Sequence, residues 1–151
     1  MNVLITTLRL PMTIEQAWEF FSRPENLQKI TPPDMQFKIT SEMPQKMYAG
    51  MIITYTVRPL FNIPVQWMTE ITHIEAQNYF IDNQKSGPFR IWHHQHHFRE
   101  IEGGVEMTDI VNYAAPFGFL GRIAERLVVE RRVKGIFEFR KKRLEEMFGT
   151  F

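Results

Sequence analysis

The sequence predicts an α+β protein in which a curved seven-stranded antiparallel sheet wraps around one long C-terminal helix, with two short helices after the first strand. Three observations support this fold class. Segments rich in β-branched and aromatic residues fill most of the chain up to Tyr113. Their connections are short, which implies antiparallel neighbours. After Gly118 the apolar residues recur with helical spacing instead.

Composition indicates an ordinary globular chain. Of its 151 residues, 44% are hydrophobic and 23% are charged, so wholesale disorder is excluded and we expect one domain over residues 1–151. Lys and Arg number 18 against 17 Asp and Glu, without the excess positive charge of a nucleic-acid-binding protein. The absence of cysteine excludes disulfides, thiolate metal sites and a cysteine nucleophile. The first residues form neither a secretory signal nor a membrane span, so we expect a cytoplasmic protein without stable membrane insertion.

The N-terminal part is expected to hold one strand and two short helices. Residues 2–10 are β-rich and end at a proline. Thr13 and Gln16 have the spacing of a capping box, in which each side chain satisfies a free backbone N–H at the helix start. Ser22 and Glu25 repeat this spacing around a proline suited to a first helical turn, and a Thr-Pro-Pro run ends the second helix.

Six further strands and a long helix complete the prediction. The strands are placed at about 35–42, 50–58, 65–75, 78–84, 89–101 and 104–113. The helix runs for about 28 residues, or ~40 Å, and its apolar stripe includes Leu127, Val128, Phe137 and Leu144. The basic run from Arg140 to Arg143 is assigned to the solvated face of this helix.

This architecture predicts a cavity. A curved sheet and a single helix do not close perfectly, and the space between them is available to a ligand. The chain contains 13 Phe, 4 Tyr, 3 Trp and 9 Met, which are residue types that fill large cores and line apolar pockets. We therefore expect a small apolar or amphipathic molecule as the partner. The segment from Pro116 to Gly121 is a candidate gate, because its glycines permit unusual backbone angles.

Four of the five histidines lie in one predicted strand, between Trp92 and Phe98. Alternate residues of a strand share a face, so Trp92, His94, His96 and Phe98 point one way while His93 and His97 point the other. In the next strand, Asp109 shares a face with the more apolar set Val105, Met107, Val111 and Tyr113.

The turn between these two strands decides which face is inside. A two-residue turn at Glu102-Gly103 or Gly103-Gly104 pairs even positions of the first strand with odd positions of the second. His94 and His96 then point into the core, with Asp109 opposite His96 or Phe98. A three-residue loop without a bulge would reverse the assignment.

Inward polar side chains need partners, because unpaired buried polar groups are costly. Three interpretations stay open: a satisfied His–Asp network with water, polar anchoring of a bound ligand, or a metal ion held by His94 and His96 with Asp109 or Asp82 as third ligand. We assign the anchoring role and no metal. The full set of expected ligand-binding residues is Tyr55, Trp67, Asp82, Gln84, Trp92, His94, His96, Phe98, Asp109 and Tyr113.

Several motifs carry a resemblance to a known superfamily. They are the run Trp18 to Leu27 with Ile30-Thr31-Pro32, Asp82-Asn83-Gln84 with Gly87-Pro88-Phe89, the alternation of Trp92, His94, His96 and Phe98, Asp109 with Tyr113, and Pro116-Phe117-Gly118 with Leu120-Gly121. In these the chain resembles the SRPBCC superfamily, whose helix-grip fold is shared by START lipid-binding domains, the birch-pollen allergen and polyketide cyclases. More narrowly, it looks like the bacterial ligand-binding SRPBCC proteins, a subfamily of largely unknown function. The resemblance covers nearly the whole chain and implies an internal cavity, without an agreed catalytic set.

Three functions are compatible with these features. The first, which we expect, is binding of a lipid, polyketide or aromatic molecule, without a cofactor. The second is a cyclase-, aromatase- or hydrolase-like enzyme that uses an inward histidine activated by Asp109 as general base. The third is a protein-interaction module, as in co-chaperone relatives of the superfamily. The sequence contains no nucleophile elbow, phosphate loop or complete metal motif, and we assign no catalytic residue.

Overall fold

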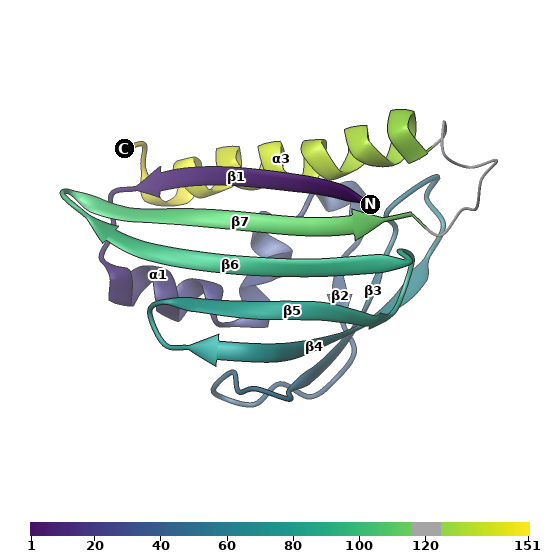
Figure 1. Ribbon diagram of the computed structural model, residues 1–151, viewed down its shortest axis with the longest axis horizontal. Helices are drawn as coiled ribbons and strands as arrows, with labels where there is room; N and C mark the ends of the chain where they lie inside the picture. The colour runs from purple at the N-terminus through teal and green to yellow at the C-terminus, as the bar shows by residue number, and fades with distance from the viewer. Residues whose placement is uncertain (116–124) are drawn as a thin grey trace.

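A seven-stranded antiparallel sheet curves around the C-terminal helix in the computed structural model, which describes residues 1–115 and 125–151 (Figure 1). The strand order is β1-β7-β6-β5-β4-β3-β2, so the first strand pairs with the last. The strands are β1 (Asn2–Leu10), β2 (Lys38–Ile39), β3 (Ile52–Val57), β4 (Val65–Glu75), β5 (Tyr79–Ser86), β6 (Ile91–Ile101) and β7 (Gly104–Ala114). The predicted fold class is confirmed, and β1 and β4 have the predicted bounds.

Two short helices and a single turn follow β1. They are α1 (Ile14–Phe21), the 3₁₀ helix η1 (Pro24–Ile30) and the 3₁₀ turn η2 (Pro33–Met35). The predicted capping box of α1 is present, with Thr13 and Gln16 bonded to each other's backbone N–H. The second predicted cap is wrong, because Ser22 is the C-cap residue of α1 and donates its backbone N–H to the carbonyl of Trp18. Arg23 precedes η1 and supplies no side-chain cap.

The strand predicted at 35–42 is reduced to the two residues of β2. The η2 turn occupies the chain up to Met35, and Gln36 then has a left-handed backbone with φ of 46°. A residue in that region cannot continue an extended strand. Beyond β2, the N–H groups of Thr40 and Ser41 both donate to the carbonyl of Thr54.

The described part of the C-terminal helix starts with a short π-helical segment. It consists of η4 (Glu125–Val129), a π-helix, and α3 (Glu130–Phe148), and the earlier part of the predicted helix lies outside the described residues. Leu127 and Val128 were expected on the buried stripe but are 62% and 40% exposed. A π turn holds more residues per turn than an α turn, so the phase shifts, and among the residues whose burial is described the stripe starts at Val129.

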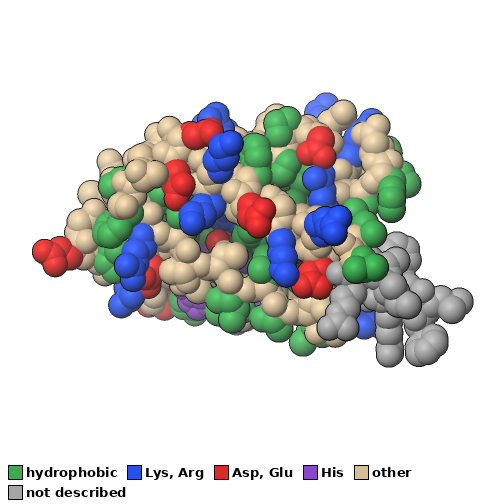
Figure 2. Space-filling model, turned by 90° about the horizontal axis from the view of Figure 1, so that it is seen from above, with side chains coloured by type: hydrophobic (Ala, Val, Ile, Leu, Met, Phe, Trp, Pro, Cys, Tyr) green, Lys and Arg blue, Asp and Glu red, His purple; other side chains and the backbone are tan. Residues whose placement is uncertain are grey.

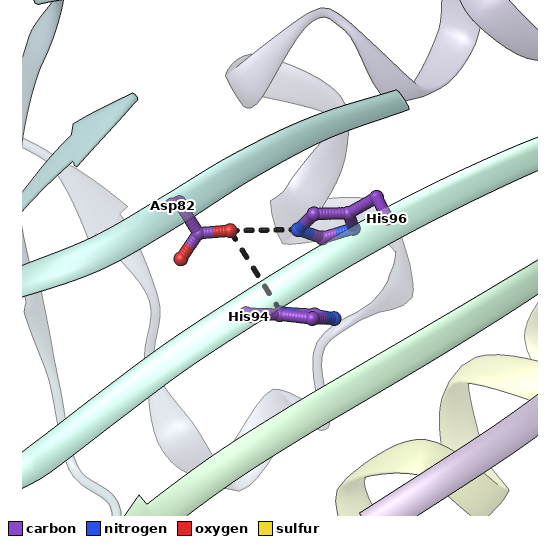
Figure 3. A group of neighbouring side chains, drawn as sticks. All are labelled: Asp82, His94 and His96. Carbon is purple, nitrogen blue, oxygen red and sulfur yellow. Dashed lines mark hydrogen bonds and ion pairs between the residues drawn. The ribbon is translucent and has the colours of Figure 1, made fainter. Parts of the chain in front are cut away.

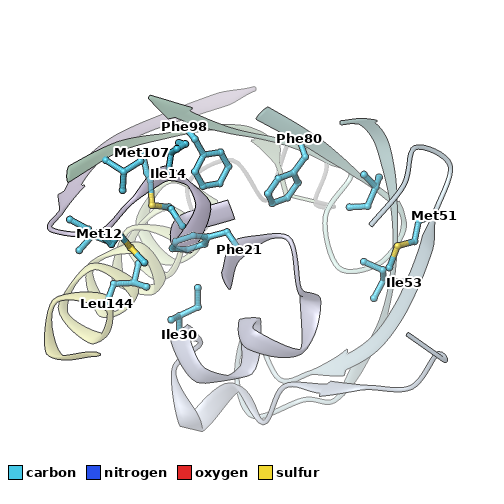
Figure 4. Packing of buried hydrophobic residues seen from close by; sticks show 14 residues of the cluster. Met12, Ile14, Phe21, Ile30, Met51, Ile53, Phe80, Phe98, Met107 and Leu144 are labelled. Carbon is cyan, nitrogen blue, oxygen red and sulfur yellow. The ribbon is translucent and has the colours of Figure 1, made fainter. Parts of the chain in front are cut away.

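The concave face of the sheet packs against α1 and α3. Phe21 of α1 lies 5.8 Å from Phe98 of β6 between ring centroids, and Leu144 of α3 belongs to the same apolar cluster as Met107 of β7 (Figure 4). This packing fills the end of the molecule near α1. The space that the helices leave unfilled against the sheet is the candidate site.

The outer side of α3 is charged but of mixed sign. Basic and acidic side chains alternate over the face seen in Figure 2, and pairs such as Lys134 with Glu130 and Arg143 with Glu146 lie along the helix. The basic residues described on this face therefore do not form the single-sign patch that a nucleic acid requires.

Candidate ligand cavity

A cavity of about 520 Å³ lies between the sheet and α3. This volume is within the range of roughly 300–1,000 Å³ that small-molecule sites occupy. Its wall is mostly apolar and combines β3 and β4 of the sheet with α3 and η1, including Ile53, Leu27, Val133 and Phe137. The period-2 alternation of the strands and the apolar stripe of the helix both direct these side chains inward.

Aromatic rings form one wall. Tyr55 stacks on Trp67 with ring centroids 5.5 Å apart, and Trp67 meets Trp92 edge-on at 5.4 Å. Phe89 packs on Trp92 at 4.8 Å. Trp67 is buried, and its indole N–H finds no hydrogen-bond acceptor among the described residues. A buried donor without a partner is costly, so this wall suits a ligand or water that accepts from Trp67.

The polar end of the cavity is formed by Asp82, His94 and His96 (Figure 3). Asp82 on β5 is paired with His94 on β6, and His96 follows two residues later on the same face. Oδ2 of Asp82 lies 2.6 Å from Nε2 of His96 and 3.8 Å from Nδ1 of His94. The two imidazole rings stack with centroids 3.6 Å apart.

A second carboxylate and an arginine lie behind these residues. Nε2 of His94 donates to Oδ1 of Asp109 at 2.8 Å, and Nδ1 of His96 lies 3.2 Å from the same oxygen without the alignment of a hydrogen bond. Nη1 of Arg140, on α3, lies 3.7 Å from Oδ1 of Asp109. His94, His96, Asp109 and Arg140 are all buried. The polar group thus consists of two carboxylates, two imidazoles that each lie between them, and the permanently charged guanidinium of Arg140 beside Asp109.

The environment separates the pKa values of the two histidines. Burial and then the neighbouring charge of His96 lower the pKa of His94. Burial also opposes the charged form of His96, but its contacts with Asp109 and Asp82 outweigh burial and raise its pKa. Near neutral pH, His94 is therefore the neutral imidazole of the pair and His96 carries the greater share of positive charge.

Both carboxyl groups stay ionised. Burial opposes ionisation of Asp82, but the hydrogen bond with His96 and the charges of His94, His96 and Arg140 lower its pKa. Burial also raises the pKa of Asp109, but the Arg140 guanidinium and then the two histidines lower it more strongly, so the pKa lies well below its ordinary value. The group therefore balances two negative charges against Arg140 and His96.

Six of the ten residues expected from the sequence line the cavity: Tyr55, Trp67, Asp82, Trp92, His94 and His96. In the described part of the chain, the other four lie beside its wall. Gln84 donates to and accepts from the backbone of Phe89, Phe98 packs between Trp18 and Phe21, Asp109 lies behind the histidines, and Tyr113 is buried against Trp92.

The predicted hairpin register is confirmed. Ile101 pairs with Gly104 across the two-residue turn Glu102-Gly103, and His96 pairs with Asp109. The inward direction of His94 and His96 follows from this register. The proposed gate from Pro116 to Gly121 lies outside the described residues.

Arg140 is a site residue that the sequence analysis assigned wrongly. It was placed on the solvated face with the basic run, but it is 7% exposed and its guanidinium lies over Phe21 and Phe137. The signal was its phase: Val133, Phe137, Arg140 and Leu144 are spaced by four, three and four residues, which is one helical face.

Comparison with known proteins shows the fold. No family model matches the chain, and no curated protein matches it. Among solved structures, protein Ms6760 of Mycobacterium smegmatis is 18% identical with a TM-score of 0.70, covering 96% of this chain and 89% of that one. Protein CV1439 of Chromobacterium violaceum is 9% identical with a TM-score of 0.76, covering 100% of both chains. The major latex-like protein 151 of Panax ginseng is 14% identical with a TM-score of 0.69, covering 97% of each.

At these identities the likeness is one of architecture. The chain has the helix-grip fold that the sequence predicted. A membrane-crossing helix would need a longer apolar run than any helix among the described residues offers.

Proposed function

We propose that this chain is a single ligand-binding domain of the SRPBCC superfamily, related to its bacterial members, and that it binds a small, mostly apolar molecule of the lipid, polyketide or aromatic type. The observation that carries the proposal is the cavity of about 520 Å³, apolar over most of its wall and polar at one end. Apolar surface supplies the binding free energy, and a few polar groups fix orientation.

The polar end favours an uncharged hydrogen-bonding group. Asp82 and Asp109 balance Arg140 and His96, so a ligand carboxylate or ammonium would leave an unpaired charge in a buried place. A hydroxyl or carbonyl group meets no such penalty. The unpaired N–H of Trp67 adds a donor for a ligand oxygen.

The test compares three probes of similar shape: naphthalene, 2-naphthol and 2-naphthoate. With metal removed by chelator, binding is followed through the fluorescence of Trp67 and Trp92 on the wall. We expect 2-naphthol to bind more tightly than naphthalene, and 2-naphthoate to bind least tightly. Val133 lines the cavity, so Val133→Phe should weaken all three, whereas Arg131→Phe on the exposed face of α3 is the matched control. Unchanged binding in Val133→Phe would show that the probes bind elsewhere.

One observation favours a second candidate function, a hydrolase- or cyclase-like activity. Nε2 of His94 donates to Asp109 at 2.8 Å, which leaves Nδ1 of a neutral imidazole to accept a proton from a water or a substrate hydroxyl. Turnover of 2-naphthyl acetate by the wild type, lost in His94→Gln while 2-naphthol still binds, would support catalysis. A rate equal to that of buffer alone would leave binding as the function.

A further inference from the structure

Three potential ligand atoms converge at the polar end of the cavity. Oδ2 of Asp82 lies 2.6 Å from Nε2 of His96 and 3.8 Å from Nδ1 of His94, and ligand atoms of the three residues all lie within 4.8 Å of one another (Figure 3). In a tetrahedral site with bonds of about 2.0–2.1 Å, neighbouring ligand atoms are about 3.3 Å apart. The two carboxylate–nitrogen distances bracket that spacing, and the ligand nitrogens of the two histidines lie within 4.8 Å of each other, so side-chain rotation can bring all three atoms around one ion.

Asp109 lies behind both imidazole rings and is hydrogen-bonded to that of His94. Metal-bound histidines almost always direct their other ring nitrogen to a carboxylate or a carbonyl. Nε2 of His94 donates to Oδ1 of Asp109 at 2.8 Å, and Nδ1 of His96 lies 3.2 Å from the same oxygen. The hydrogen bond to Asp109 holds the His94 ring, and the hydrogen bond to Asp82 holds the His96 ring, so that Nδ1 of His94 and Nε2 of His96 both face Asp82.

We propose that Asp82, His94 and His96 form a binding site for one divalent transition metal ion, Zn²⁺ or Fe²⁺, with Asp109 as the carboxylate that positions His94. Two imidazoles and one carboxylate suit these ions, whereas Ca²⁺ and Mg²⁺ prefer oxygen ligands throughout. The chain has no cysteine to supply the thiolates that select Cu⁺. All three ligands lie on the cavity wall, so the remaining coordination position faces a molecule bound in the cavity.

The ion changes the charge of the site. A divalent ion with neutral histidines, the two carboxylates and the Arg140 guanidinium gives a total of one positive charge. An anionic oxygen from the cavity is therefore the favoured additional ligand. This inference stands apart from the proposed function, because the cavity can bind an apolar molecule whether or not it holds a metal.

The experiment uses full-length protein made without a histidine tag and stripped with chelator. It is titrated with Co²⁺, followed by visible absorption, and with Zn²⁺, followed by calorimetry. We expect one ion per chain, a loss of affinity of at least about 100-fold in His94→Gln and Asp82→Asn, and a loss of about 10–100-fold in Asp109→Asn. The matched control replaces His93 and His97 with glutamine on the outer face of the same strand, and it should bind as the wild type does.

Two results would overturn the proposal. One is a wild type that takes up neither Co²⁺ nor Zn²⁺ stoichiometrically. The other is binding that survives His94→Gln and disappears in the outer-face control. X-ray absorption of the zinc-loaded wild type needs no variant: we expect two imidazole ligands per ion, and a shell of oxygen alone refutes the site. Added 2-naphthoate should change the visible spectrum of the Co²⁺ protein, and an unchanged spectrum refutes an open position facing the cavity. Binding of 2-naphthol to chelated protein is measured separately and tests only the proposed function.

Discussion

Replacing Arg140 with methionine is expected to destabilise the fold by about 3–5 kcal/mol, because it removes the permanent cation beside a buried carboxylate. Nη1 of Arg140 lies 3.7 Å from Oδ1 of Asp109, and the two side chains are only 8% and 11% exposed. Methionine keeps an apolar side chain against Phe21 and Phe137, whose rings lie 5.5 and 5.7 Å from the guanidinium carbon. The loss is therefore chiefly electrostatic rather than a cavity effect.

A double-mutant cycle isolates this interaction. Asp109→Asn keeps the shape of the carboxyl group and removes its charge, so it should also destabilise the protein, and adding Arg140→Met should then cost less than it does alone. The expected coupling free energy is about 1–3 kcal/mol. Urea denaturation of the four proteins, with chelator present, measures it. In thermal melts each single variant should lose about 6–20 °C, at about 2–4 °C per kcal/mol for a chain of this size.

An exposed neighbour on α3 provides the control. Lys142→Met makes the same change in charge at a solvated position and should stay within about 0.5 kcal/mol of the wild type. Strict additivity in the cycle, or an Arg140→Met variant as stable as Lys142→Met, would refute the charge balance described for the polar end. The argument for an uncharged ligand group would then be lost with it.

The remaining predictions concern Tyr55 and two glycines. Burial and then the charge of Asp82 raise the pKa of Tyr55 well above its ordinary value, so the stability it confers is present below about pH 10 and is lost as the pH rises further. Tyr55→Phe should therefore lose less stability across that alkaline range, and tyrosinate absorbance from Tyr55 that appears before unfolding would contradict this. Gly135→Ala should stabilise the protein by about 1 kcal/mol, because the added Cβ meets no atom within 4 Å inside a helix. Gly104→Ala should destabilise it by at least about 1–3 kcal/mol, because its Cβ would lie 2.1 Å from the carbonyl oxygen of Leu10, and thermal melts that move both variants in the same direction would refute the comparison.

The inward direction of the histidines was predictable because it depends on local geometry. A strand has a side-chain period of two, and a two-residue turn fixes the register of a hairpin. With Glu102-Gly103 as the turn, the pairing of His96 with Asp109 follows by counting. The same local character made the capping box of α1 predictable.

Two features were not predictable by the same means. β2 is short because Gln36 adopts a left-handed backbone, and a glutamine gives no signal of that conformation. The burial of Arg140 was hidden because a run of four basic residues indicates a solvated face, although the helical phase placed the first of them on the apolar stripe. Which carboxylate each histidine contacts depends on the pairing of β5 with β6 and on side-chain rotamers, and neither can be read from spacing along one strand.

The fold itself does not require the polar group. On the same faces of β6 and β7, the pair Phe98 and Met107 closes the core with apolar side chains alone. Replacing a buried charge network with apolar residues is often neutral or stabilising, so His94, His96 and Asp109 contribute less to the stability of the fold than apolar residues of similar size would. The energetic cost falls where the network borders a cavity of about 520 Å³ rather than where the core is solid. The charged group is buried next to the cavity, whereas the neighbouring pair Phe98 and Met107 fills the core with apolar side chains. This difference argues that the charged group acts on a bound molecule or ion.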